Sequence, residues 1–179
     1  MKPEIIYVYD GICSWCYGFE AQMQKLFEEL HEAYDFRFVS GGMFPAQYER
    51  RIKDAVGENF REAYARVKEL SGADISEKYL GKLVGEENYI VNSDKTAQAF
   101  SAFNQHKPSQ AQQLAFITQM QSETVQEDVQ EDYAYARALQ VNSFPQVFLK
   151  TTDGKYYLIA KGYSTAEKIA EIIHNIENE

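Results

Sequence analysis

The stretch IIYVYDGICSWCYGF, residues 5–19, decides the fold, because a strand, a turn and the start of a helix follow one another in it. Residues 5–9 are β-branched or aromatic, which predicts a buried strand, and residues 10–12 form a turn. From Cys16 onward, apolar side chains recur every three or four residues, which predicts an amphipathic helix with one apolar stripe. This stripe consists of Phe19, Met23, Leu26, Phe27 and Leu30.

The chain beyond this stretch completes an α/β pattern. Residues 36–39 predict a second strand, and a strand, a helix and a strand in close succession form a βαβ unit, normally with parallel strands. Residues 146–149 and 156–159 predict two further strands, joined by a hairpin turn at Asp153-Gly154. Ser164-Thr165 starts a last helix, whose apolar side is formed by Ile169, Ile172, Ile173 and Ile176.

The middle of the chain is predicted to be helical. Four helices are marked by Phe60, Tyr64 and Val67, then Ala97, Phe100 and Phe103, then Leu114, Ile117 and Met120, and last Val125, Val129, Tyr133 and Ala136. We therefore predict an α/β core of order βαβ…ββα, formed by residues 1–42 and 141–179. An α-helical insertion over residues 43–140 interrupts this core, and Gly41-Gly42 forms the hinge into it.

Charge and hydropathy exclude several classes of partner. The 179 residues include 18 Lys and Arg against 27 Asp and Glu, a net charge of −9, and no basic patch is present. Nucleic acid and anionic membranes are therefore not expected as partners. The apolar start at residues 5–9 is too short for a signal peptide or a membrane span, so we expect a cytoplasmic location.

The two cysteines of the chain, Cys13 and Cys16, lie where the first strand ends and the first helix begins. The first backbone N–H groups of a helix have no partner within the helix, and the helix dipole places positive charge there. This position lowers the pKa of the Cys13 thiol and makes its thiolate a usable nucleophile. Cys13 would attack a disulfide and form a mixed disulfide, which Cys16 would then resolve.

Three other interpretations of the cysteine pair are possible. A zinc site needs about four ligands, and His31, His106 and His174 show no ligand spacing, so we expect no metal. A structural disulfide across so short a loop would constrain little of the unfolded chain. Two inert buried thiols stay open as an alternative, but the strand–turn–helix setting favours redox chemistry.

A second motif, Ser143-Phe144-Pro145-Gln146, immediately precedes a predicted strand. An ordinary trans proline can open a strand, because this position needs no N–H donor in the sheet. Beside the cysteine motif, a cis Phe144-Pro145 bond facing Cys13 is favoured. It would expose the backbone of Phe144 for pairing with an extended substrate segment.

These motifs resemble those of a known family. CSWCYGF at 13–19, preceded by YVYDG, and ARALQVNSFPQVFL at 136–149 are similar to segments of the DsbA-like thioredoxin-fold family, and most to its cytoplasmic FrnE-type branch. The resemblance implies a thioredoxin-like core split by a helical insertion. It also implies a thiol–disulfide oxidoreductase or isomerase that needs no cofactor besides a redox-active Cys13–Cys16 disulfide, with protein thiols, protein disulfides or glutathione as partners.

The resemblance also assigns roles to single residues. It makes Cys13 the nucleophile and Cys16 the resolving thiol, and it makes Pro145 the cis-proline. Ser14 and Trp15 would tune the redox potential. Apart from the resemblance, the charge of Asp10 would raise the pKa of the thiol, unless Asp10 only caps the turn. Phe144 and Pro145 would contact substrate, and Trp15 would either contact it or shield the sulfurs. Two features depart from the family pattern: Tyr7 stands where many members carry a buried carboxylate, and the dipeptide lacks the His of strongly oxidising members.

Two rival functions remain. Chromene-carboxylate isomerases and kappa-type glutathione transferases resemble the same fold and bind glutathione, but they generally lack the paired cysteines. A non-catalytic chaperone module could bind extended chains in an aromatic groove, which the 14% aromatic content allows. It would act equally well without Cys13 and Cys16.

Overall fold

The computed structural model describes residues 2–57, 59–83, 89–106 and 123–178. Its centre is a four-stranded sheet of order β2-β1-β5-β6. The strands are β1 (Glu4–Tyr9), β2 (Asp35–Ser40), β5 (Gln146–Lys150) and β6 (Tyr156–Lys161). β1 runs parallel to β2 and antiparallel to β5, and β5 pairs antiparallel with β6. The sheet is therefore mixed, and β1 lies at its centre.

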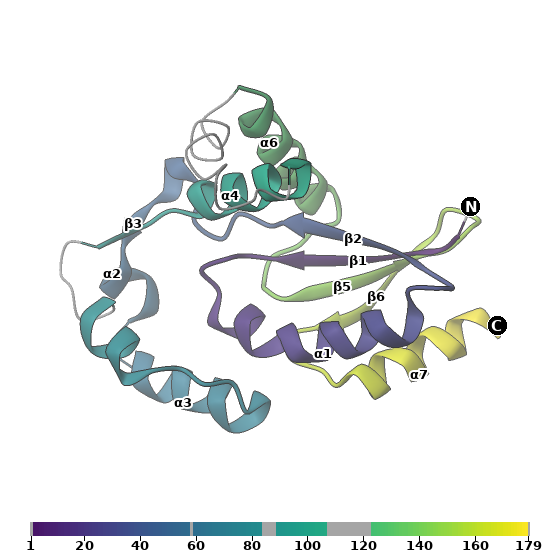
Figure 1. Cartoon of the computed structure of the whole chain (residues 1–179), viewed down its shortest axis with the longest axis horizontal. Coiled ribbons are helices and arrows are strands. Elements are labelled where there is room, and N and C mark those ends of the chain that lie inside the picture. The colour runs from purple at the N-terminus through teal and green to yellow at the C-terminus, as the bar shows by residue number, and fades with distance from the viewer. Residues whose placement is uncertain (1, 58, 84–88, 107–122, 179) are drawn as a thin grey trace.

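Helices cover both faces of this sheet (Figure 1). α1 (Ser14–Leu30) and α7 (Ala166–Glu177) lie side by side on one face, where side chains such as Ile5, Phe19 and Ile169 form the main core. Thr165 caps α7, because its side chain accepts a hydrogen bond from the amide of Lys168. The predicted α/β fold and its order of elements are confirmed.

α6 (Glu123–Ala138) packs on the opposite face of the sheet. The alternation of side chains along β1 explains this arrangement, since Ile6 and Val8 point to α6 while Ile5 and Tyr7 join the core beneath α1. All four residues that predicted this helix, from Val125 to Ala136, are buried. α4 (Ser93–His106) packs against α6.

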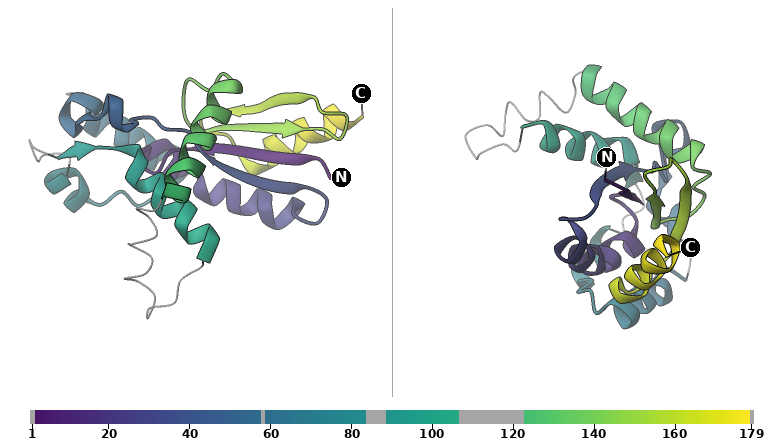
Figure 2. Two further views of the ribbon diagram at one scale, coloured as in Figure 1. Left: turned by 90° about the horizontal axis from the view of Figure 1, so that it is seen from above. Right: turned by 90° about the vertical axis from the view of Figure 1, so that its right-hand side faces the viewer.

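The remaining elements gather beyond the end of β1 that leads into α1 (Figure 2). They are η1 (Ala46–Tyr48), β3 (Arg50–Arg51), α2 (Ile52–Val56), α3 (Phe60–Ser71), η2 (Tyr79–Leu83) and β4 (Ile90–Val91). β3 and β4 form a small antiparallel pair that the sequence did not predict, because two residues carry no measurable periodicity. Ile52, Tyr64, Leu80 and Val91 form a second small core here.

The predicted helix around Leu114, Ile117 and Met120 lies outside the described residues. The division into a core and an insertion over 43–140 stays a prediction, and the packing of α6 ties the end of that segment closely to the sheet. None of the helices in the described ranges is both long and apolar enough to cross a membrane.

Candidate active site

Cys13 occupies the position that joins β1 to α1. It is the N-cap residue of α1 and has an extended backbone, with φ −75° and ψ 113°. Its amide donates a hydrogen bond to the carbonyl of Asp10 at 3.1 Å, and its own carbonyl accepts one from the amide of Tyr17 at 3.1 Å. The strand–turn–helix geometry predicted from the sequence therefore places this thiol at the start of the helix.

Both cysteines are reduced and largely buried, with 6% of Cys13 and 5% of Cys16 exposed. The pKa of Cys13 is lowered, first because the Cys16 thiol donates a hydrogen bond to its sulfur, and then because the amides of Trp15 and Cys16 point at it. Burial and the charge of Asp10 oppose this shift. The main cause is thus the neighbouring thiol, whereas the sequence predicted only the helix amides.

The pKa of Cys16 moves in the opposite direction. Burial raises it, and the neighbouring Cys13 raises it further. The pair therefore consists of one thiol that ionises readily and one that holds its proton. This asymmetry is the arrangement that a two-step exchange through a mixed disulfide requires.

The loop before β5 faces the thiol of Cys13. The Phe144-Pro145 peptide bond is cis, as the sequence predicted. The carbonyl oxygen of Phe144 lies 3.9 Å from the Cys13 sulfur, although 131 positions separate the two residues in the chain. The ring of Phe144 packs over Gly41, where an added Cβ would come within 1.9 Å of a ring carbon, so only glycine fits there.

Asp10 joins two loops at the site. Its side chain is buried, and its two oxygens accept hydrogen bonds from the amide of Ile12 at 2.9 Å and from that of Met43 at 2.8 Å. This carboxylate therefore caps the turn before Cys13 and ties it to the loop after β2. Its charge also raises the pKa of both cysteines, although this is a smaller effect than their mutual interaction.

Tyr7 lies on β1 six residues before Cys13, at the position where the resemblance implied a buried carboxylate. Its ring is buried among Tyr9, Phe19 and Phe38, and its hydroxyl donates to the carbonyl of Cys16 at 3.5 Å. Burial and both cysteines raise the pKa of Tyr7, so the phenol stays neutral and acts only as a hydrogen-bond donor.

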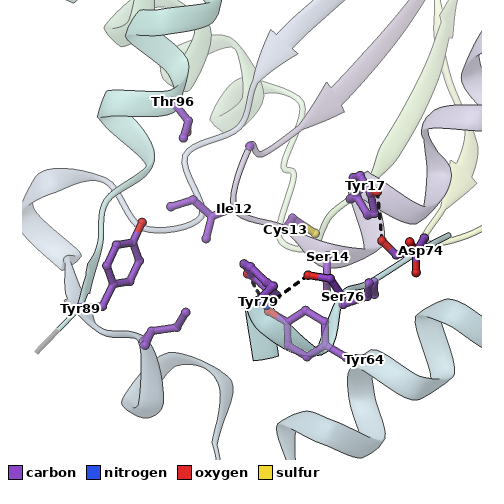
Figure 3. Close-up of a pocket in the computed structure, with 13 residues that line it drawn as sticks. Ile12, Cys13, Ser14, Tyr17, Tyr64, Asp74, Ser76, Tyr79, Tyr89 and Thr96 are labelled. Carbon is purple, nitrogen blue, oxygen red and sulfur yellow. Dashed lines mark hydrogen bonds between the residues drawn. The ribbon is translucent and has the colours of Figure 1, made fainter. Parts of the chain in front are cut away.

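A cavity of about 390 Å³ adjoins Cys13 (Figure 3). Cys13 and Ser14 line it at the start of α1, whereas Trp15, Phe144 and Pro145 lie outside its lining. Segments of the predicted insertion form the far wall with Ile52, Tyr64, Asp74, Ile75, Ser76, Tyr79, Tyr89 and Thr96. Helical periodicity placed Tyr64 on a buried face, but no sequence signal pointed to the others.

Within the part of the chain that the structure describes, no three His, Cys, Asp or Glu side chains come close enough to hold an ion.

The mixed sheet, the dithiol at the first helix and the cis-proline opposite it define a protein of the thioredoxin class. The chain belongs to the thioredoxin-like domain family, whose model matches residues 2–177. Comparison with curated proteins gives no match.

Solved structures share the fold at low sequence identity. A proposed protein disulfide isomerase from Nitrosomonas europaea aligns with a TM-score of 0.79 at 17% identity, over 99% of this chain and 98% of that chain. Cytosolic disulfide reductase DsbM from Pseudomonas aeruginosa aligns with a TM-score of 0.66 at 17% identity, over 98% of this chain and 100% of that chain. The structure of DsbM with GSH aligns with a TM-score of 0.63 at 16% identity, over 97% of this chain and 99% of that chain. DsbA from Xylella fastidiosa aligns with a TM-score of 0.55 at 16% identity, over 99% of this chain and 87% of that chain. The DsbA-like fold is thus established, and assignment to the FrnE-type branch stays a prediction.

Proposed function

We propose that this protein is a thiol–disulfide oxidoreductase in which Cys13 is the nucleophile and Cys16 the resolving thiol. The observation that carries the proposal is the position of the dithiol at the start of α1, opposite the cis-proline loop. The lowered pKa of Cys13 and the raised pKa of Cys16 agree with it. The carbonyl of Phe144, 3.9 Å from the Cys13 sulfur, marks where a substrate backbone would lie.

The reaction proceeds in two exchanges. The Cys13 thiolate attacks one sulfur of a substrate disulfide, forms a mixed disulfide and releases the other sulfur as a thiolate. Cys16 then gives its proton to water and attacks the Cys13 sulfur, which releases the second substrate thiolate. The substrate disulfide gains two electrons and two protons overall, and the protein dithiol becomes a disulfide. The reverse sequence oxidises a substrate dithiol.

The neighbouring residues would position substrate and set the potential. Pro145 and Phe144 would offer backbone groups to an extended segment, and Trp15 would contact the segment beside the thiols. Ser14, Trp15 and Asp10 would tune the relative stability of the dithiol and the disulfide. The dithiol carries both electrons, so the proposal includes no further cofactor.

Either protein thiols and disulfides or, alternatively, glutathione are the proposed partners, and the cytoplasm is the proposed location. Two structural neighbours support both points, since DsbM from Pseudomonas aeruginosa is a cytosolic disulfide reductase and one of its structures contains GSH.

Trapping of a mixed disulfide tests the assignment. The Cys16→Ser variant, incubated with a peptide disulfide, is expected to accumulate a covalent adduct at Cys13 that mass spectrometry detects. Cys13→Ser is the matched control and should form none. If Cys16→Ser instead turned over glutathione conjugation or isomerisation at the wild-type rate, the rival glutathione-dependent class would replace this one. A chaperone module would suppress aggregation equally well with both cysteines changed to Ser.

The direction of electron flow follows from the equilibrium potential against a glutathione buffer. A potential of about −270 mV would define a thioredoxin-like reductant, and a potential of about −120 mV would define a strong oxidant. Recovery of activity by a scrambled disulfide protein would separate an isomerase from both.

A further inference from the structure

The cavity beside Cys13 carries a second inference, which rests on the proposed function. Its lining includes Cys13 and Ser14, so a group that fills it lies against the residue that would react (Figure 3). Its volume of about 390 Å³ is that of a small-molecule site, so it can hold a side chain or a small organic group.

Tyrosine rings dominate this lining: Tyr17, Tyr64, Tyr79 and Tyr89. Three of their hydroxyls are engaged within the protein. The hydroxyls of Tyr64 and Tyr79 lie 3.3 Å apart, and that of Tyr17 donates to the carbonyl of Asp74 at 3.3 Å, as the dashed lines in Figure 3 show. The aromatic faces are therefore a large part of what the cavity offers to a ligand, and such faces attract cations.

The charge of the lining points in the same direction. Among the described lining residues, the one charged side chain is that of Asp74. Its carboxylate lies 4.0 Å from the ammonium of Lys68, but both side chains are largely exposed, so a ligand can displace this weak pair. The net charge of −9 adds a general repulsion of anions.

A carboxylate bound in this cavity would thus leave water with only the amides at the start of α1 to attract it, because the described lining holds no cationic side chain. An ammonium or guanidinium group would gain the tyrosine faces and Asp74. We propose that the cavity selects the substrate by charge: it accepts a disulfide with a cationic group beside the reacting sulfur and disfavours the two carboxylates of each glutathione unit.

The chemistry that fits is a Lys or Arg side chain next to the cysteine of a protein disulfide, or a small amine-bearing disulfide. In either case the Cys13 thiolate attacks the sulfur next to the bound cation, the partner thiolate leaves, and Cys16 completes the exchange as described above.

The test compares three small disulfides that differ in charge: cystamine with two ammonium groups, the neutral bis(2-hydroxyethyl) disulfide, and dithiodiglycolate with two carboxylates. Loss of protein thiols is followed by quenching with an alkylating agent and mass spectrometry at low salt. The same series with a free thiol peptide gives the intrinsic preference of a thiolate. The wild-type ratio of cystamine to dithiodiglycolate rates is expected to exceed that reference by about tenfold or more, and salt should reduce the excess.

Variants connect the preference to the cavity. Asp74→Asn should lower the rate ratio by about threefold, since one nearby charge is lost in a solvent-exposed setting. Tyr89→Leu should lower it by about two- to fivefold, because it removes one aromatic face and keeps an apolar side chain. Glu171→Gln on α7 makes the same charge change outside the lining and should leave the ratio as it is.

Two peptide disulfides with Lys or Glu beside the cysteine distinguish the source of the cation. Preference for the Lys peptide indicates a protein substrate, and preference for cystamine alone indicates a small aminothiol. Rates that follow the free-thiol reference for all probes would refute charge selection and leave the oxidoreductase standing. If no disulfide oxidised Cys13, the proposed function itself would fail.

Discussion

At the scale of single residues, the chemistry of Cys13 depends on a neighbour in its own motif. The thiol of Cys16 contributes more to the lowered pKa of Cys13 than the amides of α1 do. The spacing of the motif explains this, because residues three apart at the start of a helix lie on the same face. Cys16 therefore has two roles, as the hydrogen-bond donor before the reaction and as the attacking thiol after it.

Replacing Cys16 tests the first of these roles. Cys16→Ala removes the donor and should raise the pKa of Cys13 toward its ordinary value, whereas Cys16→Ser keeps an O–H donor. Iodoacetamide should therefore alkylate Cys13 at neutral pH about tenfold more slowly in Cys16→Ala than in Cys16→Ser, the loss of one charge-assisted hydrogen bond. Equal rates across the pH range would mean that the helix amides dominate.

Tyr7 gives a second prediction at this scale. Its neutral, buried hydroxyl donates to the backbone carbonyl of Cys16 and interacts with the Cys16 side chain, so it can turn to the thiolate that forms there but cannot remove the proton of Cys16. Tyr7→Phe should slow the attack of Cys16 on a preformed mixed disulfide by about tenfold or less, with little change in the pH dependence of that step. Rapid-quench measurements at several pH values check this.

Tyr9→Phe is the matched control on the same strand, because the Tyr9 hydroxyl accepts a hydrogen bond from Ser40 at 3.4 Å and makes none to Cys16 in the described structure. A steep pH dependence that disappears in Tyr7→Phe would contradict the assigned role and would make the phenol a base.

At the scale of elements, the contact between α1 and α3 determines where the cavity wall stands. Gly18 is buried in α1, and an added Cβ would lie 2.7 Å from a methyl carbon of Val67 and 2.8 Å from the hydroxyl of Ser71. α3 also carries Tyr64, which lines the cavity. The absence of a side chain at Gly18 therefore sets how closely Tyr64 approaches the start of α1 at Cys13.

Gly18→Ala should therefore destabilise the protein by about 1–3 kcal/mol through overpacking. The higher helix propensity of alanine offsets up to about 1 kcal/mol of this loss. Urea unfolding, with an unchanged slope, measures the difference. Gly81→Ala is the control, since nothing lies within 4 Å of its added Cβ, and it should change stability by no more than about 0.5 kcal/mol. Equal stability of the two variants would show that α3 moves freely on α1.

At the scale of the whole molecule, the site joins segments that are far apart in the chain. Two amides in the loop after β2 donate hydrogen bonds to distant segments. The amide of Met43 donates to Asp10 in the turn before Cys13, and the amide of Phe44 donates to the hydroxyl of Ser93 at the start of α4. Asp132 of α6 accepts the amide of Ser40. These hydrogen bonds fix α4 and α6 relative to the thiols, so the stability of the fold and the geometry of the site are coupled.

The lowered pKa of Cys13 should appear in the stability of the whole chain. Folding lowers this pKa, so the native state binds fewer protons than the unfolded state in the pH range between the two values. The resulting stabilisation is complete above the ordinary thiol pKa and is lost as the pH falls through the native value, by about 1.4 kcal/mol per unit of difference.

Cys16 has a raised pKa and acts in the opposite sense at high pH, so the comparison uses variants without it. Urea unfolding of Cys16→Ser against Cys13→Ser/Cys16→Ser across this pH range should show stability rising with pH only where Cys13 is present. Parallel curves would indicate a thiol with an unshifted pKa.

The sequence by itself determined the local parts of this protein. The strand at residues 5–9, the turn, the dithiol and α1 follow from side-chain type and periodicity within one continuous stretch. The same holds for α3, α6 and the β5–β6 hairpin, and the family segment at 136–149 indicated the cis-proline. In each case the signal lies within the few residues that form the element.

Tertiary structure decided the rest, because contacts between distant segments depend on how whole elements pack and leave no periodic trace. Only the folded chain brings Phe144 to 3.9 Å from the Cys13 sulfur across 131 positions. Only packing places Tyr79 and Tyr89 around a cavity at that thiol, and makes the Cys16 thiol the main cause of the low Cys13 pKa.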